Sequence, residues 1–157
     1  MIFGKRKKEF SFFGDLKLND GEIRLALRET AGVDYERGYL PTYYFRICSA
    51  VSGEVYGRCD LRIGTNKNVR YAGNIGYAVY EPYRGNKYAY KSCILLFELA
   101  KRHGMKKLTI TCNPENLPSR RTCELLGARY IETVDLPEDH ELFLMGEKKK
   151  VVYEVSL

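Results

Sequence analysis

The chain has 157 residues, which fits one domain, and its 45% hydrophobic and 29% charged residues are typical of a globular protein. The net charge of +6 comes mostly from two tracts, because residues 1–10 contribute +3 and residues 147–150 contribute +2; this argues against a broad basic face for nucleic acid. The longest strictly apolar run has five residues, far below the ~20 that a membrane span requires, and no apolar stretch of a secretory signal follows the basic N-terminus.

The sequence pattern of the first half of the chain predicts mainly strands. Alternating apolar side chains predict a strand over residues 21–30, and the mixed segment 31–42 predicts a loop or a short helix. Two β-branched and aromatic runs, 42–51 and 54–64, are separated by a Ser-Gly pair and predict an antiparallel hairpin. A glycine-rich strand is expected over 73–80.

The second half alternates helices with strands. Apolar residues that share one helical face predict a long helix over 88–103, followed by a short β-branched strand at 108–112. A second helix is expected from an N-cap at Asn116 to Gly127. Two further strands, 128–134 and 150–156, complete the chain.

This order of elements predicts an α/β (α+β) fold. We expect a mixed, mostly antiparallel twisted sheet of six or seven strands, with helices on both faces. Residues 1–157 form one domain in this interpretation, and residues 1–20 form an N-terminal extension that is partly flexible. Five cysteines without a CxxC pair predict reduced thiols and a cytoplasmic protein, and with two histidines they show no metal-ligand spacing.

The turn before the long helix has the composition of an anion site. Three cations, Arg84, Lys87 and Lys91, and no acid lie between residues 84 and 91. The first amides of a helix have no partner within the helix, and its dipole favours negative charge there. Residues 85–92 differ at one position from the P-loop pattern, but Tyr90 replaces its second glycine and no magnesium-binding aspartate follows a strand, which argues against nucleotide hydrolysis.

Another phosphate motif fits better. Residues 84–89, RGNKYA, resemble the [QR]-x-x-G-x-[GA] pyrophosphate loop of the GNAT superfamily of N-acetyltransferases, with a strand before it and an apolar helix after it. The family's second motif, N-x-x-[AS] followed by G-[FA], resembles the positions of Asn116, Ser119, Gly127 and Ala128. The resemblance spans nearly the whole chain and is nearest to the branch of the ribosomal-protein N-terminal acetyltransferases.

The resemblance implies a fold in which acetyl-CoA lies between two splayed parallel strands, here 75–80 and 108–112, and needs no metal. The pantetheine arm would lie along Tyr77, Ala78 and Val79, with a backbone N–H near Val79 stabilising the oxyanion. Asn116 would contact the pantetheine, and Ser119 would cap or line that site. The residues that the resemblance assigns to the pyrophosphate loop are Arg84, Gly85, Asn86, Lys87, Tyr88, Ala89 and Tyr90.

Three positions depart from the family's pattern. Lys87 stands where the family usually has glycine, so it is strained if the loop requires a positive φ and adds to phosphate binding if it does not. Cys123 stands in place of the tyrosine that frequently serves as general acid in the family, either as a proton donor or as a packing residue. Thr111 replaces a frequent glutamate, which leaves the general base open among Tyr77, Asp60, Glu81 and water.

The leading hypothesis is therefore transfer of the acetyl group from acetyl-CoA to an amine by direct attack in a ternary complex. The alternative is an acyl-CoA-binding module with weak or no catalysis. The acceptor stays open, and the tyrosine-rich segment 36–46 either lines its pocket or packs a strand. We expect no membrane or nucleic-acid partner, and a homodimer is compatible with the sequence.

Overall fold

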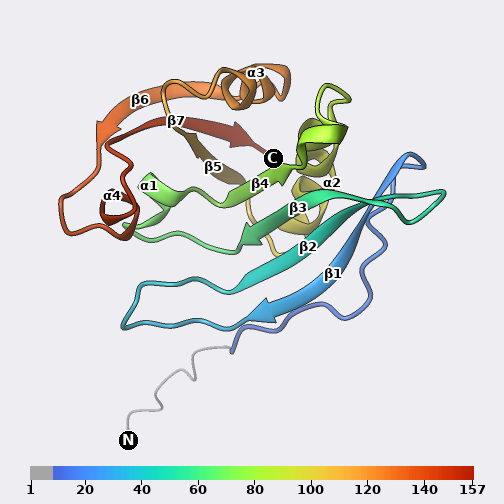
Figure 1. Ribbon diagram of the computed structural model, residues 1–157. Coiled ribbons are helices and arrows are strands. Elements are labelled where there is room, and N and C mark those ends of the chain that lie inside the picture. The colour runs from blue at the N-terminus through green and yellow to red at the C-terminus, as the bar shows by residue number, and fades with distance from the viewer. Residues whose placement is uncertain (1–8) are drawn as a thin grey trace, which may run out of the picture.

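The computed structural model describes residues 9–157 (Figure 1). The basic residues 5–8, and with them part of the predicted extension 1–20, lie outside the described residues. The strands are β1 (Ile23–Ala31), β2 (Thr42–Ser49), β3 (Val55–Arg62), β4 (Ile75–Val79), β5 (Lys107–Cys112), β6 (Arg129–Asp135) and β7 (Lys149–Ser156). The helices are α1 (Val69–Ala72), α2 (Tyr88–Arg102), α3 (Leu117–Leu125) and α4 (Glu141–Leu144), with a 3-10 turn, η1 (Glu81–Tyr83).

The strands form two antiparallel sheets, β1-β2-β3-β4 and β5-β7-β6. In the first sheet, side chains alternate between a buried face, which includes Phe45 and Ile47, and an outer face that carries charged residues. The predicted hairpin is confirmed, since Phe45 of β2 pairs with Cys59 of β3. The seven strands and their helices also confirm the predicted fold class.

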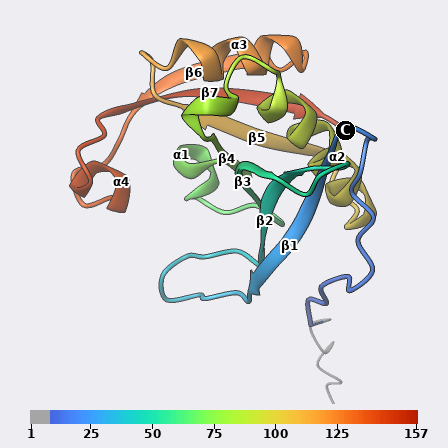
Figure 2. The ribbon, with the colours of Figure 1, turned by 45° about the vertical axis from the view of Figure 1, so that its right-hand side comes forward.

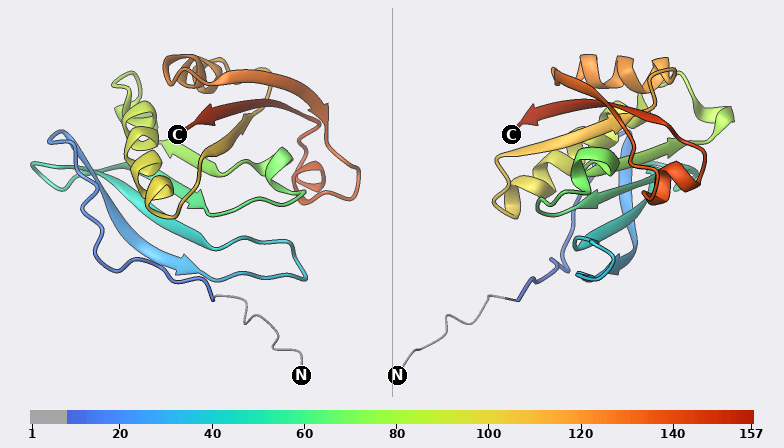
Figure 3. Two further views of the ribbon diagram at one scale, coloured as in Figure 1. Left: turned by 180° about the vertical axis from the view of Figure 1, so that it is seen from behind. Right: turned by 90° about the vertical axis from the view of Figure 1, so that its left-hand side faces the viewer.

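Helices α2 and α3 pack on the buried face of the two sheets. Cys93, Leu96 and Leu99 of α2 are fully buried in one core together with Cys123 of α3. From behind, α2 crosses the first sheet (Figure 3, left). The predicted helix 88–103 is confirmed as α2, and its apolar face packs against the core as its pattern predicted.

Helices α1 and α4 lie beside each other on the opposite side of the molecule (Figure 2). His140, which precedes α4, packs against Tyr71 of α1 with ring centroids 5.2 Å apart. The sequence analysis missed both helices, because four residues are too few to show a helical period. The segment 32–41 contains no helix; it is a loop closed by an antiparallel bridge between Asp34 and Tyr39.

Lysines of the tract 147–150 have structural partners. Lys150 is buried and forms an ion pair with Glu147 at 2.6 Å, and Lys149 pairs with Asp135 at 2.5 Å. This tract therefore stabilises the start of β7 locally. Within residues 9–157, no helix is long and apolar enough to cross a membrane, and no group of three metal-binding side chains comes together.

Candidate functional site

The two sheets meet at the beginnings of β4 and β5. The backbone N–H of Asn74 donates to the carbonyl oxygen of Thr109 at 2.7 Å, and the Asn74 side-chain oxygen accepts from the Thr109 N–H at 2.8 Å. Beyond this point the strands belong to different sheets and run in diverging directions (Figures 1 and 2). The ends of β4 and β5 therefore leave backbone groups unpaired between them.

The end of β4 presents a free backbone donor to this opening. The Tyr80 N–H donates to Tyr56 of β3 at 2.8 Å, so the Tyr80 amide faces β3. Because successive amides of a strand point to alternate sides, the Val79 N–H and carbonyl face away from β3. Arg84 Nε donates to the Val79 carbonyl oxygen at 3.0 Å. The Val79 N–H remains as a donor beside that occupied carbonyl.

The turn between β4 and α2 brings backbone amides together at the same end. Gly85 has φ 89° and Lys87 has φ 61°, and Lys87 is the one non-glycine residue with a positive φ among residues 9–157. The start of α2 has no side-chain cap and no acid in its first turn. A turn with positive φ angles that leads into an uncapped helix N-terminus is a typical anion site.

The positive φ at Lys87 answers the question left open by the sequence. The loop does adopt the backbone conformation that favours glycine, so Lys87 carries strain there. Lys91 takes no part in the loop, because its ammonium forms an ion pair with Glu22. Asn86 donates from its side-chain amide to the Tyr83 carbonyl at 2.9 Å and holds the turn in place.

The floor of the opening joins β4 to α3. The Tyr77 hydroxyl lies 2.6 Å from the Ser119 hydroxyl. The N-cap of α3 is Asn116, whose side-chain oxygen accepts from the Ser119 N–H at 3.2 Å. Ser119 is buried, whereas Asn116 is exposed. Ser119 thus lines the floor and Asn116 caps the helix.

Two candidate proton-transfer groups have shifted pKa values. Burial raises the pKa of Cys123 to about 12, and this thiol is fully buried in the core. Burial likewise raises the pKa of Tyr77, with Ser119 acting in the opposite direction. Both groups are protonated at neutral pH, but only Tyr77 is partly exposed at the floor of the opening.

Asp60 lies on the outer face of the first sheet, next to β4. Its Oδ1 is 3.2 Å from Arg62 Nη2, and a Cβ at Gly76 would come within 2.7 Å of its Oδ2. Burial raises the pKa of Asp60, while Arg62 and Arg58 lower it. Glu81, another candidate base, is exposed in η1.

Gly57 positions β4, and sequence reasoning missed it. A Cβ at Gly57 would lie 2.2 Å from the Ala78 carbonyl oxygen and 2.9 Å from the Val79 Cα. Only a glycine allows the two strands to approach this closely. A glycine inside a predicted strand is the signal that could have indicated this close backbone approach.

A cleft of about 320 Å³ opens on the outer side of the molecule. It lies between the loop 32–41, α1 and the start of α4. Tyr39 and Tyr44 of the tyrosine-rich segment line this cleft, together with Arg62, His140 and Glu141. The Tyr39 hydroxyl donates to Glu141 at 3.1 Å. The cleft is on the face of β2 and β3 opposite α2.

Comparisons with known proteins support the resemblance seen in the sequence. Residues 6–129 match the family model of an acetyltransferase (GNAT) domain. No curated protein matched the sequence.

Solved structures share the fold. An acetyltransferase of the GNAT family from Bacillus anthracis is 19% identical with a TM-score of 0.56, covering 72% of this chain and 65% of that one. The microcin C7 self-immunity acetyltransferase, in complex with acetyl-CoA and AMP, is 16% identical with a TM-score of 0.58, covering 74% and 61%. An acetyltransferase from Salmonella typhimurium that modifies the N-terminal serine of ribosomal protein L7/L12 is 19% identical with a TM-score of 0.58, covering 78% and 67%. The chain spans about two thirds or less of the length of these proteins.

Proposed function

This chain belongs to the GNAT family of acetyltransferases, and from that membership we propose that it transfers the acetyl group of acetyl-CoA to an aliphatic amine. The observation that carries this proposal is the divergence of β4 and β5 directly beside the glycine-containing turn at the start of α2. That arrangement offers a slot for an extended arm and, at its end, amides for a pyrophosphate. The acetyl-CoA complex of the microcin C7 self-immunity protein, which shares the fold, supports this choice of co-substrate.

In this proposal the pyrophosphate binds the amides of residues 85–90, with Arg84 fixing the loop through its bond to Val79. The pantetheine arm runs along Ala78 and Val79 toward Asn116 and Ser119. The site needs no metal, because backbone amides and the helix dipole supply the positive potential.

The reaction proceeds by attack of the neutral amine nitrogen on the thioester carbon. A new C–N bond forms, the C–S bond breaks, and the electrons of that bond leave on the CoA sulfur. In this proposal the Val79 N–H stabilises the oxyanion, a type of contact worth ~2.7–4 kcal/mol where its removal has been measured. Holding both substrates together supplies much of the remaining rate.

The reaction also requires a proton donor for the leaving thiolate and an acceptor for the amine proton. We assign the donor to the leaving thiolate to Tyr77 rather than Cys123, because Tyr77 is partly exposed at the floor of the opening, whereas Cys123 is fully buried in the core. Asp60, with its raised pKa and its place against Gly76, is the residue of this chain best suited to accept the amine proton. Five buried, unpaired cysteines favour a reducing cytoplasmic setting for this chemistry.

The alternative is an acyl-CoA-binding module, which the strained Lys87 and the buried Cys123 favour. Calorimetry of CoA binding, followed by thiol release from acetyl-CoA over a panel of amines, separates the two. The panel should include a peptide with an N-terminal serine, the group that the Salmonella protein modifies. Thiol release with any amine supports the transferase, and CoA binding without release from the whole panel supports the module.

A further inference from the structure

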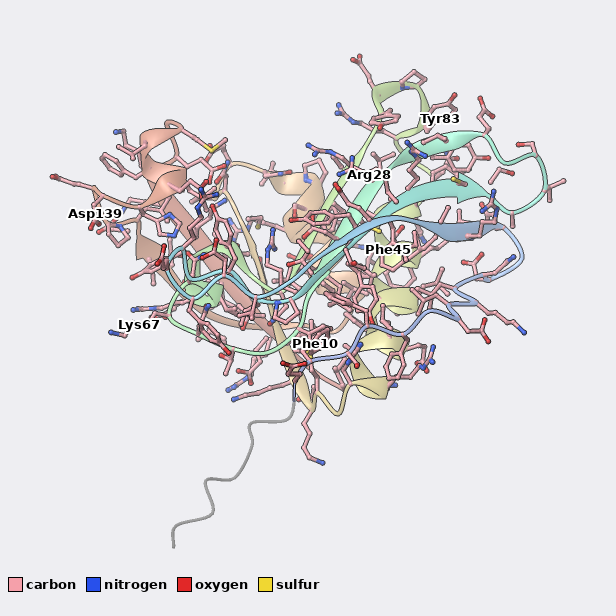
Figure 4. All side chains as sticks on the ribbon, turned by 90° about the horizontal axis from the view of Figure 1, so that it is seen from below. Phe10, Arg28, Phe45, Lys67, Tyr83 and Asp139 are labelled. Carbon is pink, nitrogen blue, oxygen red and sulfur yellow. The ribbon has the colours of Figure 1, made fainter. Side chains whose placement is uncertain are left out.

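Three arginines lie side by side on the outer face of the first sheet. Arg46 of β2 pairs directly with Arg58 of β3. The partner of Arg46 in β1 is Ala26, and Arg24 lies two residues before Ala26 on the same face of the sheet. All three are exposed. Figure 4 labels Arg28 and Phe45; Arg28 stands over the Tyr44 ring on this outer face, whereas Phe45 is in the core beside α2.

The arginines of this row have no ion-pair partner within residues 9–157, although Arg58 is near enough to Asp60 to lower the pKa of that carboxyl. Arg28 and Arg62 on the same face form ion pairs with Glu29 and Asp60. Within residues 9–157, Arg24, Arg46 and Arg58 form no ion pair and no side-chain hydrogen bond. Like charges directly opposite each other in a sheet are destabilising. The fold therefore keeps two facing arginines, Arg46 and Arg58, that form no ion pair within residues 9–157, an arrangement that costs stability.

The row leads to the strand that carries the site. Arg58 pairs with Ala78, so Ala26, Arg46, Arg58 and Ala78 stand in line across β1, β2, β3 and β4. Neighbouring strands of a sheet lie ~4.8 Å apart. Counted across the sheet from Ala78, β3 is therefore about 5 Å away, β2 about 10 Å and β1 about 14 Å. An extended peptide advances ~3.3 Å per residue, so about four or five residues would cover that distance.

We propose that this arginine row, defined as Arg24, Arg46 and Arg58, docks the acidic segment of a polypeptide acceptor whose amine lies at Ala78 and Val79. The inference rests on the proposed function and names its substrate class. An aliphatic amine is a better nucleophile toward a thioester than the amino group of a nucleic-acid base, whose lone pair is conjugated with the ring, and a polypeptide supplies an aliphatic amine. The row is open and spans three strands, which suits an extended chain.

The test uses two heptapeptides that share a free N-terminal serine. One carries Asp and Glu over about four following residues, and the other carries Asn and Gln there. KM and kcat for acetyl transfer, and direct binding by fluorescence anisotropy, are measured for wild type and for the double variant Arg24→Gln/Arg46→Gln. This variant keeps Arg58, whose charge lowers the pKa of Asp60. The matched control is Arg121→Gln/Arg129→Gln, which removes the same charge from exposed ion pairs on α3 and β6.

Wild type should bind the acidic peptide at least ~10-fold more tightly than the neutral one, as expected for two exposed ion pairs at the upper end of their range. The Arg24→Gln/Arg46→Gln variant should lose that advantage through KM with kcat retained, and the control should keep it. High salt should also abolish it, because the Debye length falls to about 3 Å at 1 M.

Equal binding of the two peptides by wild type, or an equal loss in the control, would overturn the proposal. Tighter binding of a single-stranded RNA than of the acidic peptide to this row would also overturn it and assign the face to nucleic acid. Failure of the proposed function would give a different result. CoA binding would be lost, or no amine would release thiol from acetyl-CoA. The peptide preference of the arginine row is measured separately, by anisotropy.

Discussion

The Tyr77 hydroxyl lies 2.6 Å from the Ser119 hydroxyl, and this contact joins β4 to the first turn of α3 at the floor of the opening between β4 and β5. The two groups come from segments 42 residues apart. Burial keeps the phenol protonated, since it raises the Tyr77 pKa. The pair therefore holds a proton where the proposed reaction releases a thiolate.

Replacing Tyr77 with Phe should lower kcat by ~100-fold, the lower range for losing a general acid, with little change in CoA affinity. Cys123→Ala is the comparison. It should leave kcat unchanged and cost about 1 kcal/mol of stability, because it removes a buried sulfur from the core. Single-turnover kinetics and urea unfolding give both values. A normal kcat in Tyr77→Phe together with a large kcat loss in Cys123→Ala would reverse the assignment.

The strain at Lys87 predicts that glycine and alanine at this position differ in their effect on stability. Lys87→Gly should be more stable than Lys87→Ala by about 1 kcal/mol, because glycine accommodates a φ of 61° and alanine does not. Both variants lose the same ammonium, so charge makes no contribution to the difference between their stabilities. Thermal unfolding without ligand measures it. Equal stabilities would contradict the backbone conformation of this loop.

Gly57→Ala should displace β4 and weaken acetyl-CoA binding by more than 10-fold, because its Cβ would collide with the Ala78 carbonyl oxygen. Calorimetry of CoA binding measures the effect. Gly32→Ala is the control, since nothing lies within 4 Å of its Cβ and its φ is not positive. Unchanged CoA affinity in folded Gly57→Ala would show that the position of β4 does not govern the site.

The sequence predicted the elements that have a clear period or cap, including α2, the hairpin of β2 and β3, and the N-cap at Asn116. It did not predict α1 or α4, whose four residues each show no period. The conformation of Lys87 depends on the three-dimensional path of the turn. The net charge of the chain indicated no basic face. The register of β2 and β3 nevertheless places Arg46 opposite Arg58. Acidic residues elsewhere offset these positive charges in the net charge, so the net charge does not reveal the pair.

His103 makes stability depend on pH. The Tyr43 hydroxyl accepts from the Phe13 N–H at 2.8 Å and lies 2.7 Å from His103 Nε2, where a neutral imidazole can accept its proton. Burial, with Arg102 nearby, lowers the His103 pKa from 6.5, so the unfolded chain binds the proton more readily.

Stability contributed by neutral His103 should therefore be present above pH 6.5 and lost as pH falls through the lowered pKa. Urea unfolding between pH 5 and pH 8, at roughly half-unit steps, should show this slope in wild type and a smaller one in His103→Phe, which keeps an aromatic ring beside Phe10. An identical slope in the variant would assign the pH dependence to other groups.

Amide hydrogen exchange by NMR, with and without CoA, tests most directly whether the co-substrate lies between β4 and β5. Binding should protect the Val79 amide and the amides of residues 85–90, because the pantetheine and the pyrophosphate accept from them. Protection confined to the outer cleft around Tyr39 and Glu141, or no protection at residues 79 and 85–90 at saturating CoA, would contradict the site.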